Sequence, residues 1–195
     1  MIPTQPFTAP VPPPPAPPEA ARARLTALWP APVAATAAVL TVSDVADARS
    51  LAYLLLSLPV MYLAIAVTRR AWTSWPVVVG VLVGYNLLEA VGVDPVPVLV
   101  AAGLALAVFG LAHGSLRGPG LFALQAPALP VFGGAAVAAL YASPGAALVI
   151  VALGLLAHAA WDAFHWWRGQ VISTSLAQWC IVFDTAVGLG VLVLL

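Results

Sequence analysis

The stretch V-P-V-L-V-A-A-G-L-A-L-A-V-F-G-L-A, Val96 to Ala112, contains no charged side chain. About 20 apolar residues in a helix are enough to cross the hydrocarbon core of a bilayer. A transmembrane β-barrel would instead need segments of roughly ten residues that alternate in polarity. Because this run of Ala, Leu and Val is continuous, it predicts a membrane-spanning helix.

The composition of the whole chain agrees with this interpretation. Of its 195 residues, 63% are hydrophobic and 7% are charged, and the mean hydropathy is +1.03. A soluble domain carries about 25% charged residues, and a fold with so few charges could not cover itself in water. The sequence therefore predicts an all-α, polytopic integral membrane helical bundle.

Seven apolar segments have a length close to a membrane span, and their boundaries are set by prolines, glycines and charged residues. Pro30 and Pro32 interrupt the first segment, so six spans is the alternative. Residues 1–24 are rich in proline and form a predicted disordered tail, which leaves 25–195 as a single transmembrane domain. The predicted spans are 25–43, 51–68, 76–93, 96–115, 127–142, 146–167 and 177–195.

Arginine placement orients these spans, because basic residues beside membrane-spanning helices collect in the cytoplasm. With seven spans, four groups of arginines fall on one side. This places the N-terminus in the cytoplasm and the C-terminus outside the cell membrane. The groups are Arg22 with Arg24, Arg69 with Arg70, Arg117, and Arg168.

A weak internal repeat suggests that the bundle is built from repeated helical hairpins. Leu111-Ala112-His113 recurs as Leu156-Ala157-His158, 45 residues later. Each period would then be a hairpin whose first helix ends near a cytoplasmic arginine.

Ionisable residues inside the spans are the candidates for chemistry, because each costs about 2.5–3.5 kcal/mol in hydrocarbon. His158, Asp162 and His165 stand at i, i+4 and i+7. This spacing places them within about 60° of arc on one helix face, in a column about 10 Å tall.

The next span carries a second pair on one face, Cys180 and Asp184, at i and i+4. If the last two helices pair antiparallel, His158 reaches the depth of Asp184, and Asp162 or His165 reaches that of Cys180. His113, about one turn inside Arg117, is expected near the cytoplasmic end of the same pocket. Glu89, near the outer end of the third span, is a weaker candidate, as is Cys180.

Imidazole and carboxylate together suit Zn, Mn or non-haem Fe, and helical bundles build metal sites from residues three or four apart. The predicted metal ligands are His158, Asp162, His165 and Asp184. Asp162 or Asp184, whichever does not ligate, would act as general base in an enzyme that acts on a lipid or another hydrophobic small molecule.

Two other functions fit the same residues. The His/Asp column could relay protons in a small proton- or metal-ion-coupled transporter, or it could lock helices together in a non-catalytic membrane subunit. His165 could also simply sit at headgroup level among tryptophans. Nucleic acid is not expected as a partner, because all seven basic residues are arginines that form no cluster.

Overall fold

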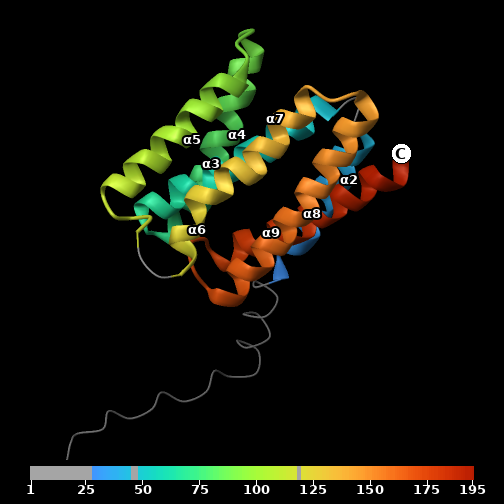
Figure 1. Ribbon diagram of the computed structural model, residues 1–195. Coiled ribbons are helices and arrows are strands. Elements are labelled where there is room, and N and C mark those ends of the chain that lie inside the picture. Colours follow the sequence, from blue (N-terminus) through green and yellow to red (C-terminus); the bar gives the residue numbers. More distant parts are fainter. Residues whose placement is uncertain (1–27, 45–47, 118–119) are drawn as a thin grey trace, which may run out of the picture.

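The computed structural model describes residues 28–44, 48–117 and 120–195, and these residues form helices without strands. The predicted proline-rich tail, with Arg22 and Arg24, lies outside the described residues. The elements in chain order are α2 (Pro30–Ser43), α3 (Ala48–Thr68), η1 (Ala71–Thr73), α4 (Ser74–Ala90), α5 (Pro95–Ala112), α6 (Leu121–Ala128), η2 (Leu129–Gly133), α7 (Gly134–Leu140), α8 (Pro144–Arg168) and α9 (Thr174–Leu194) (Figure 1).

Six helical segments of the described chain are long and apolar enough to cross a membrane. The predicted helical membrane bundle is confirmed at this level. The first predicted span corresponds to α2, a shorter apolar helix of 14 residues. Such a helix is about 21 Å long, less than the roughly 30 Å of a bilayer core.

The fifth predicted span begins earlier than expected. It runs as one helical segment from Leu121 to Leu140, through α6, η2 and α7. Pro127 lies inside α6 and Pro130 inside η2, which is a π-helical turn. A π turn lets a helix continue past groups that break the regular hydrogen-bond pattern. Gln125 therefore lies inside a helix, although the predicted boundary left it outside.

Helix α3 is the centre of the bundle, with most of its side chains buried. It packs against α5, α7, η2, α4 and α8. Helix α4 is the opposite case, because Ser74 at its first position is its only buried residue. In an apolar chain, the exposed side chains of such a helix face lipid.

Helix α2 packs against α9, and the two run parallel. At one end the Trp29 ring lies 5.5 Å from that of Trp75, which in turn contacts Trp179 near the start of α9. At the other end, Val42 lies against Gly190. Helix α2 therefore begins at the same end of the bundle as α9, as an alternation of seven segments requires.

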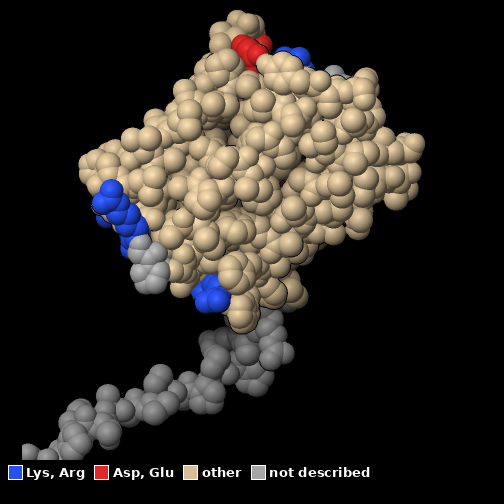
Figure 2. Space-filling model, in the orientation of Figure 1, with Lys and Arg blue, Asp and Glu red and all other residues tan. Residues whose placement is uncertain are grey.

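Apart from Asp162 and Asp184, the described acidic residues and arginines lie at the two ends of the bundle. Figure 2 shows arginine side chains at the left and lower edges, acidic side chains beside a further arginine patch at the top, and an uncharged surface between these regions. One end, the arginine end, is where α3, α5 and α8 terminate. The arginines that follow or close these helices are Arg69, Arg70, Arg117 and Arg168. The opposite end, the acidic end, carries Asp44, Glu89 and Asp94 near helix ends, together with Arg49.

Local signals set the hairpin of α8 and α9. Helix α8 ends at Gly169, whose left-handed backbone (φ 59°) suits glycine, and Ser173 caps α9 by accepting from the Leu176 amide. Gly188 allows the two helices to approach closely, since a Cβ there would lie 2.9 Å from the Ala152 carbonyl oxygen. This close approach brings the polar residues of both helices together.

Candidate metal centre

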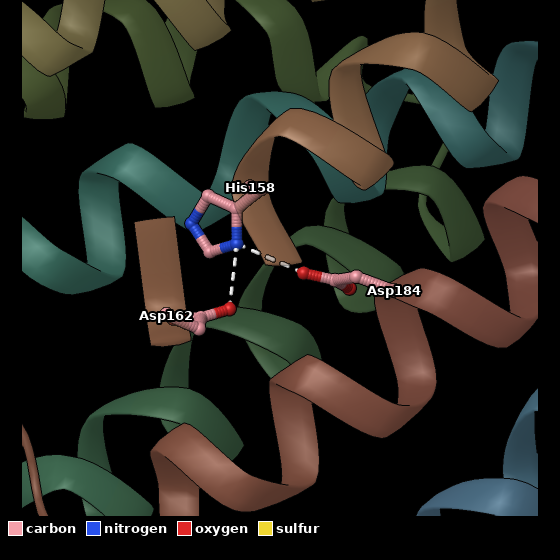
Figure 3. A group of neighbouring side chains, drawn as sticks. All are labelled: His158, Asp162 and Asp184. Atoms are coloured by element: carbon pink, nitrogen blue, oxygen red, sulfur yellow. Dashed lines mark hydrogen bonds and ion pairs between the residues drawn. The ribbon is translucent and has the colours of Figure 1, made fainter. Parts of the chain in front are cut away.

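Three side chains from α8 and α9 converge on one point in the middle of the bundle. His158 Nδ1 lies 2.8 Å from an oxygen of Asp184 and 3.0 Å from an oxygen of Asp162 (Figure 3). One ligand atom from each residue falls within 4.8 Å of the other two. The predicted pairing of His158 with Asp184 across the hairpin is confirmed.

The site lies deep within the helices that form it. Asp184 stands ten residues from each end of α9, and His158 stands ten residues before Arg168. Ten residues correspond to about 15 Å of helix. All three side chains are at most 1% exposed, so water does not screen their charges.

One of the carboxylate oxygens has no donor of its own. His158 Nδ1 carries at most one hydrogen, and its hydrogen bond goes to Asp184 Oδ2. Asp162 Oδ2, although 3.0 Å from the same nitrogen, is buried without a hydrogen-bond partner. A buried carboxylate oxygen in that state is costly unless a proton or a cation reaches it.

No arginine of the described chain reaches this group, because the ion pairs of Asp162 and Asp184 involve His158 alone. The described arginines stand at or near helix ends. Arg168, which is on the same helix as Asp162, lies six residues further along α8. Two carboxylates buried with one imidazole between them therefore form a group that could hold a metal ion.

Tyr62 on the central helix α3 is a member of the site that the sequence did not reveal. Its hydroxyl donates a hydrogen bond to Asp162 Oδ1. The Tyr62 ring also stands edge-on to His158 and to His165, with centroids 5.2 and 5.1 Å apart. Tyr62 thus fixes the carboxylate of Asp162, so that its other oxygen faces His158.

His165 is buried on the same face but forms a separate pair. Its Nδ1 donates to the Trp161 carbonyl at 2.8 Å, because a carbonyl can only accept. In the neutral ring Nε2 is then the acceptor, and Gln125 Nε2 donates to it at 2.9 Å. His165 is 1% exposed, so its ring is enclosed by protein, and it is not part of the three-residue group.

Cys180 is buried and lines a cavity of about 250 Å³ together with Asp184 and Tyr62. This placement agrees with the predicted face shared by Cys180 and Asp184. The other residues that line the cavity are apolar or aromatic and come from α2, α3, α4 and α9: Ala37, Leu54, Leu58, Met61, Val78, Leu82, Leu176, Trp179 and Phe183.

His113 and Glu89 lie away from the centre. His113 closes α5, is exposed, and stacks on Phe109 with ring centroids 4.0 Å apart. Glu89 is exposed near the end of α4. The structure brings neither side chain to the group formed by His158, Asp162 and Asp184.

Tyr62 and Gln125 escaped the sequence-based search for different reasons. A tyrosine in an apolar span carries no charge to mark it. Gln125 was placed outside a span by a boundary drawn at residue 127. A search for any hydrogen-bonding side chain within the predicted spans would have found Tyr62, whereas Gln125 needed the correct start of its helix at Leu121.

Comparison with protein-family models, with curated proteins and with solved structures found no match. The chain itself has two informative properties. It has the helices of a multi-pass membrane protein, and it holds a buried His/Asp group that could bind a metal ion.

Proposed function

We propose that this protein is an integral membrane enzyme that uses one transition metal ion, held by His158, Asp162 and Asp184, to act on a hydrophobic substrate. The three residues supply one nitrogen and two carboxylate oxygens, a donor set that suits Zn, Mn or Fe. His165, expected as a fourth ligand, is engaged by Gln125 and Trp161 instead.

The observation that carries this proposal is the buried Asp162 oxygen without a donor, 3.0 Å from the nitrogen that Asp184 already engages. A metal ion satisfies all three ligand atoms at once, whereas the single hydrogen on His158 Nδ1 cannot. The Tyr62 hydroxyl on Asp162 Oδ1 is the kind of outer hydrogen bond that orients a ligating carboxylate.

Catalysis is supported by the cavity beside the centre. Its wall is apolar except where Tyr62, Asp184 and Cys180 face it, and an apolar pocket with a few convergent polar groups is the usual form of a small-molecule site. A metal held by these residues would supply a Lewis acid in dry surroundings, suited to activating water and polarising a carbonyl or phosphoryl oxygen. The carboxylate that binds the metal more weakly would accept the proton from that water.

The proposed orientation places the arginine end of the bundle in the cytoplasm. It is supported by Arg69, Arg70, Arg117 and Arg168 at one end and by the tendency of basic flanking residues to stay inside. The C-terminus then faces outward. A fusion tag after Leu195 that is reached by a membrane-impermeant reagent in intact cells would support this orientation.

Metal analysis of the protein purified in detergent without chelator tests the proposal. We expect about one Zn, Mn or Fe per chain in the wild type, since the group offers a single set of ligands. Asp184→Asn removes a ligand charge while keeping the size of the side chain, so it should lose the metal. Incubation with membrane lipids should give products that disappear on chelation and return with the metal.

The matched control is Asp94→Asn, because Asp94 caps α5 at the far end of the bundle and lies outside the group. It should keep the metal. A wild-type protein that holds less than about a tenth of an ion per chain would overturn the proposal. Structural and catalytic metal sites bind their ion tightly, so most chains should hold one.

A proton-coupled transporter is the second candidate, and one observation favours it. Tyr62, Asp162, His158 and Asp184 are neighbouring polar groups on three helices, with hydrogen bonds from Tyr62 to Asp162 and between His158 and Asp184, and a 3.0 Å contact from His158 Nδ1 to Asp162 Oδ2. Such groups can pass protons in carriers. In proteoliposomes a carrier would show pH-driven flux that Asp162→Asn abolishes, with or without bound metal.

A further inference from the structure

The cavity beside the metal centre has two different ends. Toward the arginine end of the bundle its walls are Val78 of α4 and Leu176 of α9, both near the starts of their helices. At mid-depth its wall includes Tyr62, Cys180 and Asp184. The apolar end therefore leads away from the metal ligands and into the cytoplasmic half of the proposed membrane layer.

A second, polar hollow adjoins the mid-depth end. Thr41, Asp44, Ser50 and Tyr85 contribute to its wall at the acidic end of the bundle. The hollow and the cavity share three wall residues, Leu54, Leu82 and Phe183. Asp184 lines the cavity, and the residue before it, Phe183, lines both the cavity and the hollow, so the metal ligand lies close to their shared wall.

The size of the cavity limits what it can hold. About 250 Å³ is the volume of about eight water-sized groups. This accommodates a segment of one aliphatic chain and leaves no room for a second. Helix α4, which contributes Val78 and Leu82 to the cavity wall, has no fully buried side chain after Ser74, so this wall separates the cavity from the outer surface by a single helix.

We propose that the substrate is a single-chain amphiphile, bound with its chain in the apolar cavity, its head group in the polar hollow, and the linkage between them beside Asp184. This inference rests on the proposed function, and it adds the substrate class and the bond acted on. A single-chain lipid with an ester or amide linkage has the required shape.

The reaction at that linkage is a hydrolysis, and it needs only water. The water oxygen adds to the carbonyl carbon, and the bond from that carbon to the head-group oxygen or nitrogen breaks. One water proton passes through Asp162 or Asp184 to the departing head group. The products are a carboxylic acid on the chain side and a free alcohol or amine on the head side.

Photo-crosslinking of the full-length protein in lipid nanodiscs tests the substrate class without relying on turnover. The probe is a monoacylglycerol with a diazirine in its chain. We expect the label on the segments around Val78, Leu82 and Phe183, and we expect unlabelled monoacylglycerol to compete. Competition of equal strength by a two-chain phospholipid would overturn the single-chain assignment.

Val78→Trp and Val79→Trp form a matched pair on neighbouring positions of α4. Val78 lines the cavity, whereas Val79 is 56% exposed on the outer surface. The indole of Val78→Trp would occupy volume that the aliphatic chain needs, so Val78→Trp should reduce specific labelling about tenfold or more, and Val79→Trp should not. Leu82→Phe is a milder second filling variant in case Val78→Trp fails to fold.

Labelling and metal content fail independently. Specific labelling of a wild-type protein that holds no metal would overturn the proposed function, but it would still support the binding site for the aliphatic chain. Metal in the wild type with no competed label, or with equal label in Val78→Trp and Val79→Trp, would overturn the substrate assignment alone.

Discussion

Two copies of the tripeptide Leu-Ala-His stand in very different surroundings. His113 ends α5, is exposed, and its Nδ1 lies 3.0 Å from the carbonyl of Phe109 in its own helix. His158 lies inside α8, is 1% exposed, and its Nδ1 meets Asp162 and Asp184. The same local sequence therefore gives one histidine at the rim of the bundle and one at its centre.

The difference comes from the neighbours of the two helices. Helix α8 packs against α9, α7 and α3, so its middle is surrounded by protein. Helix α5 packs on α3 and touches α4, and much of its surface faces outward. A polar residue is retained deep in a membrane bundle when partners from other helices satisfy it, and only His158 has such partners.

The largest expected effect is the loss of metal in His158→Ala, compared with His113→Ala. Removing one member of a buried charged group costs about 3–5 kcal/mol, which corresponds to more than about a 100-fold change in Kd. His113→Ala should leave metal affinity unchanged and stability within about 0.5 kcal/mol. Metal titration of both variants measures this, and equal losses would show that the two histidines do not differ as described.

Tyr62→Phe should weaken metal binding about 10- to 100-fold, because it removes the outer hydrogen bond that orients Asp162. Tyr53→Phe is the control on the same helix, since the Tyr53 hydroxyl bonds Arg49 at 2.5 Å, away from the centre. The measurement is metal affinity by competition with a chelator. An unchanged affinity in Tyr62→Phe would mean that the hydroxyl does not position the ligand.

Gly188→Ala should destabilise the α8–α9 hairpin by about 1–3 kcal/mol, because its Cβ meets the backbone carbonyl of Ala152 at 2.9 Å. Gly103→Ala on α5 is the counterpart. Its Cβ meets the end of the Leu129 side chain at 2.9 Å, which can move, so we expect a smaller loss. Thermal unfolding in detergent compares the two, and equal shifts would argue against a tighter α8–α9 contact.

Gln125→Leu should cost about 1 kcal/mol of stability, because His165 Nε2 loses its donor. It should leave the bound metal in place, since His165 is outside the group. Asn86→Leu is a suitable control, because Asn86 is exposed and donates to the carbonyl four residues earlier, as Gln125 also does. Loss of metal in Gln125→Leu would instead indicate that His165 is a metal ligand.

Much of the architecture could be predicted from the sequence because lipid imposes a simple rule on it. Long uncharged segments such as Val96–Ala112 must be helical to satisfy their backbone groups in hydrocarbon. The hairpin that pairs His158 with Asp184 followed from helix periodicity and a short connection, and it is confirmed. The boundary at residue 127 was wrong because a π turn carries the helix past Pro127 and Pro130.

The sequence by itself determined the class of fold and one polar face, because both depend on regular helical spacing within a single segment. Only the tertiary structure decided that Tyr62 joins Asp162 and that Gln125 takes His165 away from the centre, leaving His113 outside it. These outcomes depend on which helices touch and at what rotation. In a bundle of apolar helices, close packing of side chains from distant segments sets that choice, and no local pattern encodes it.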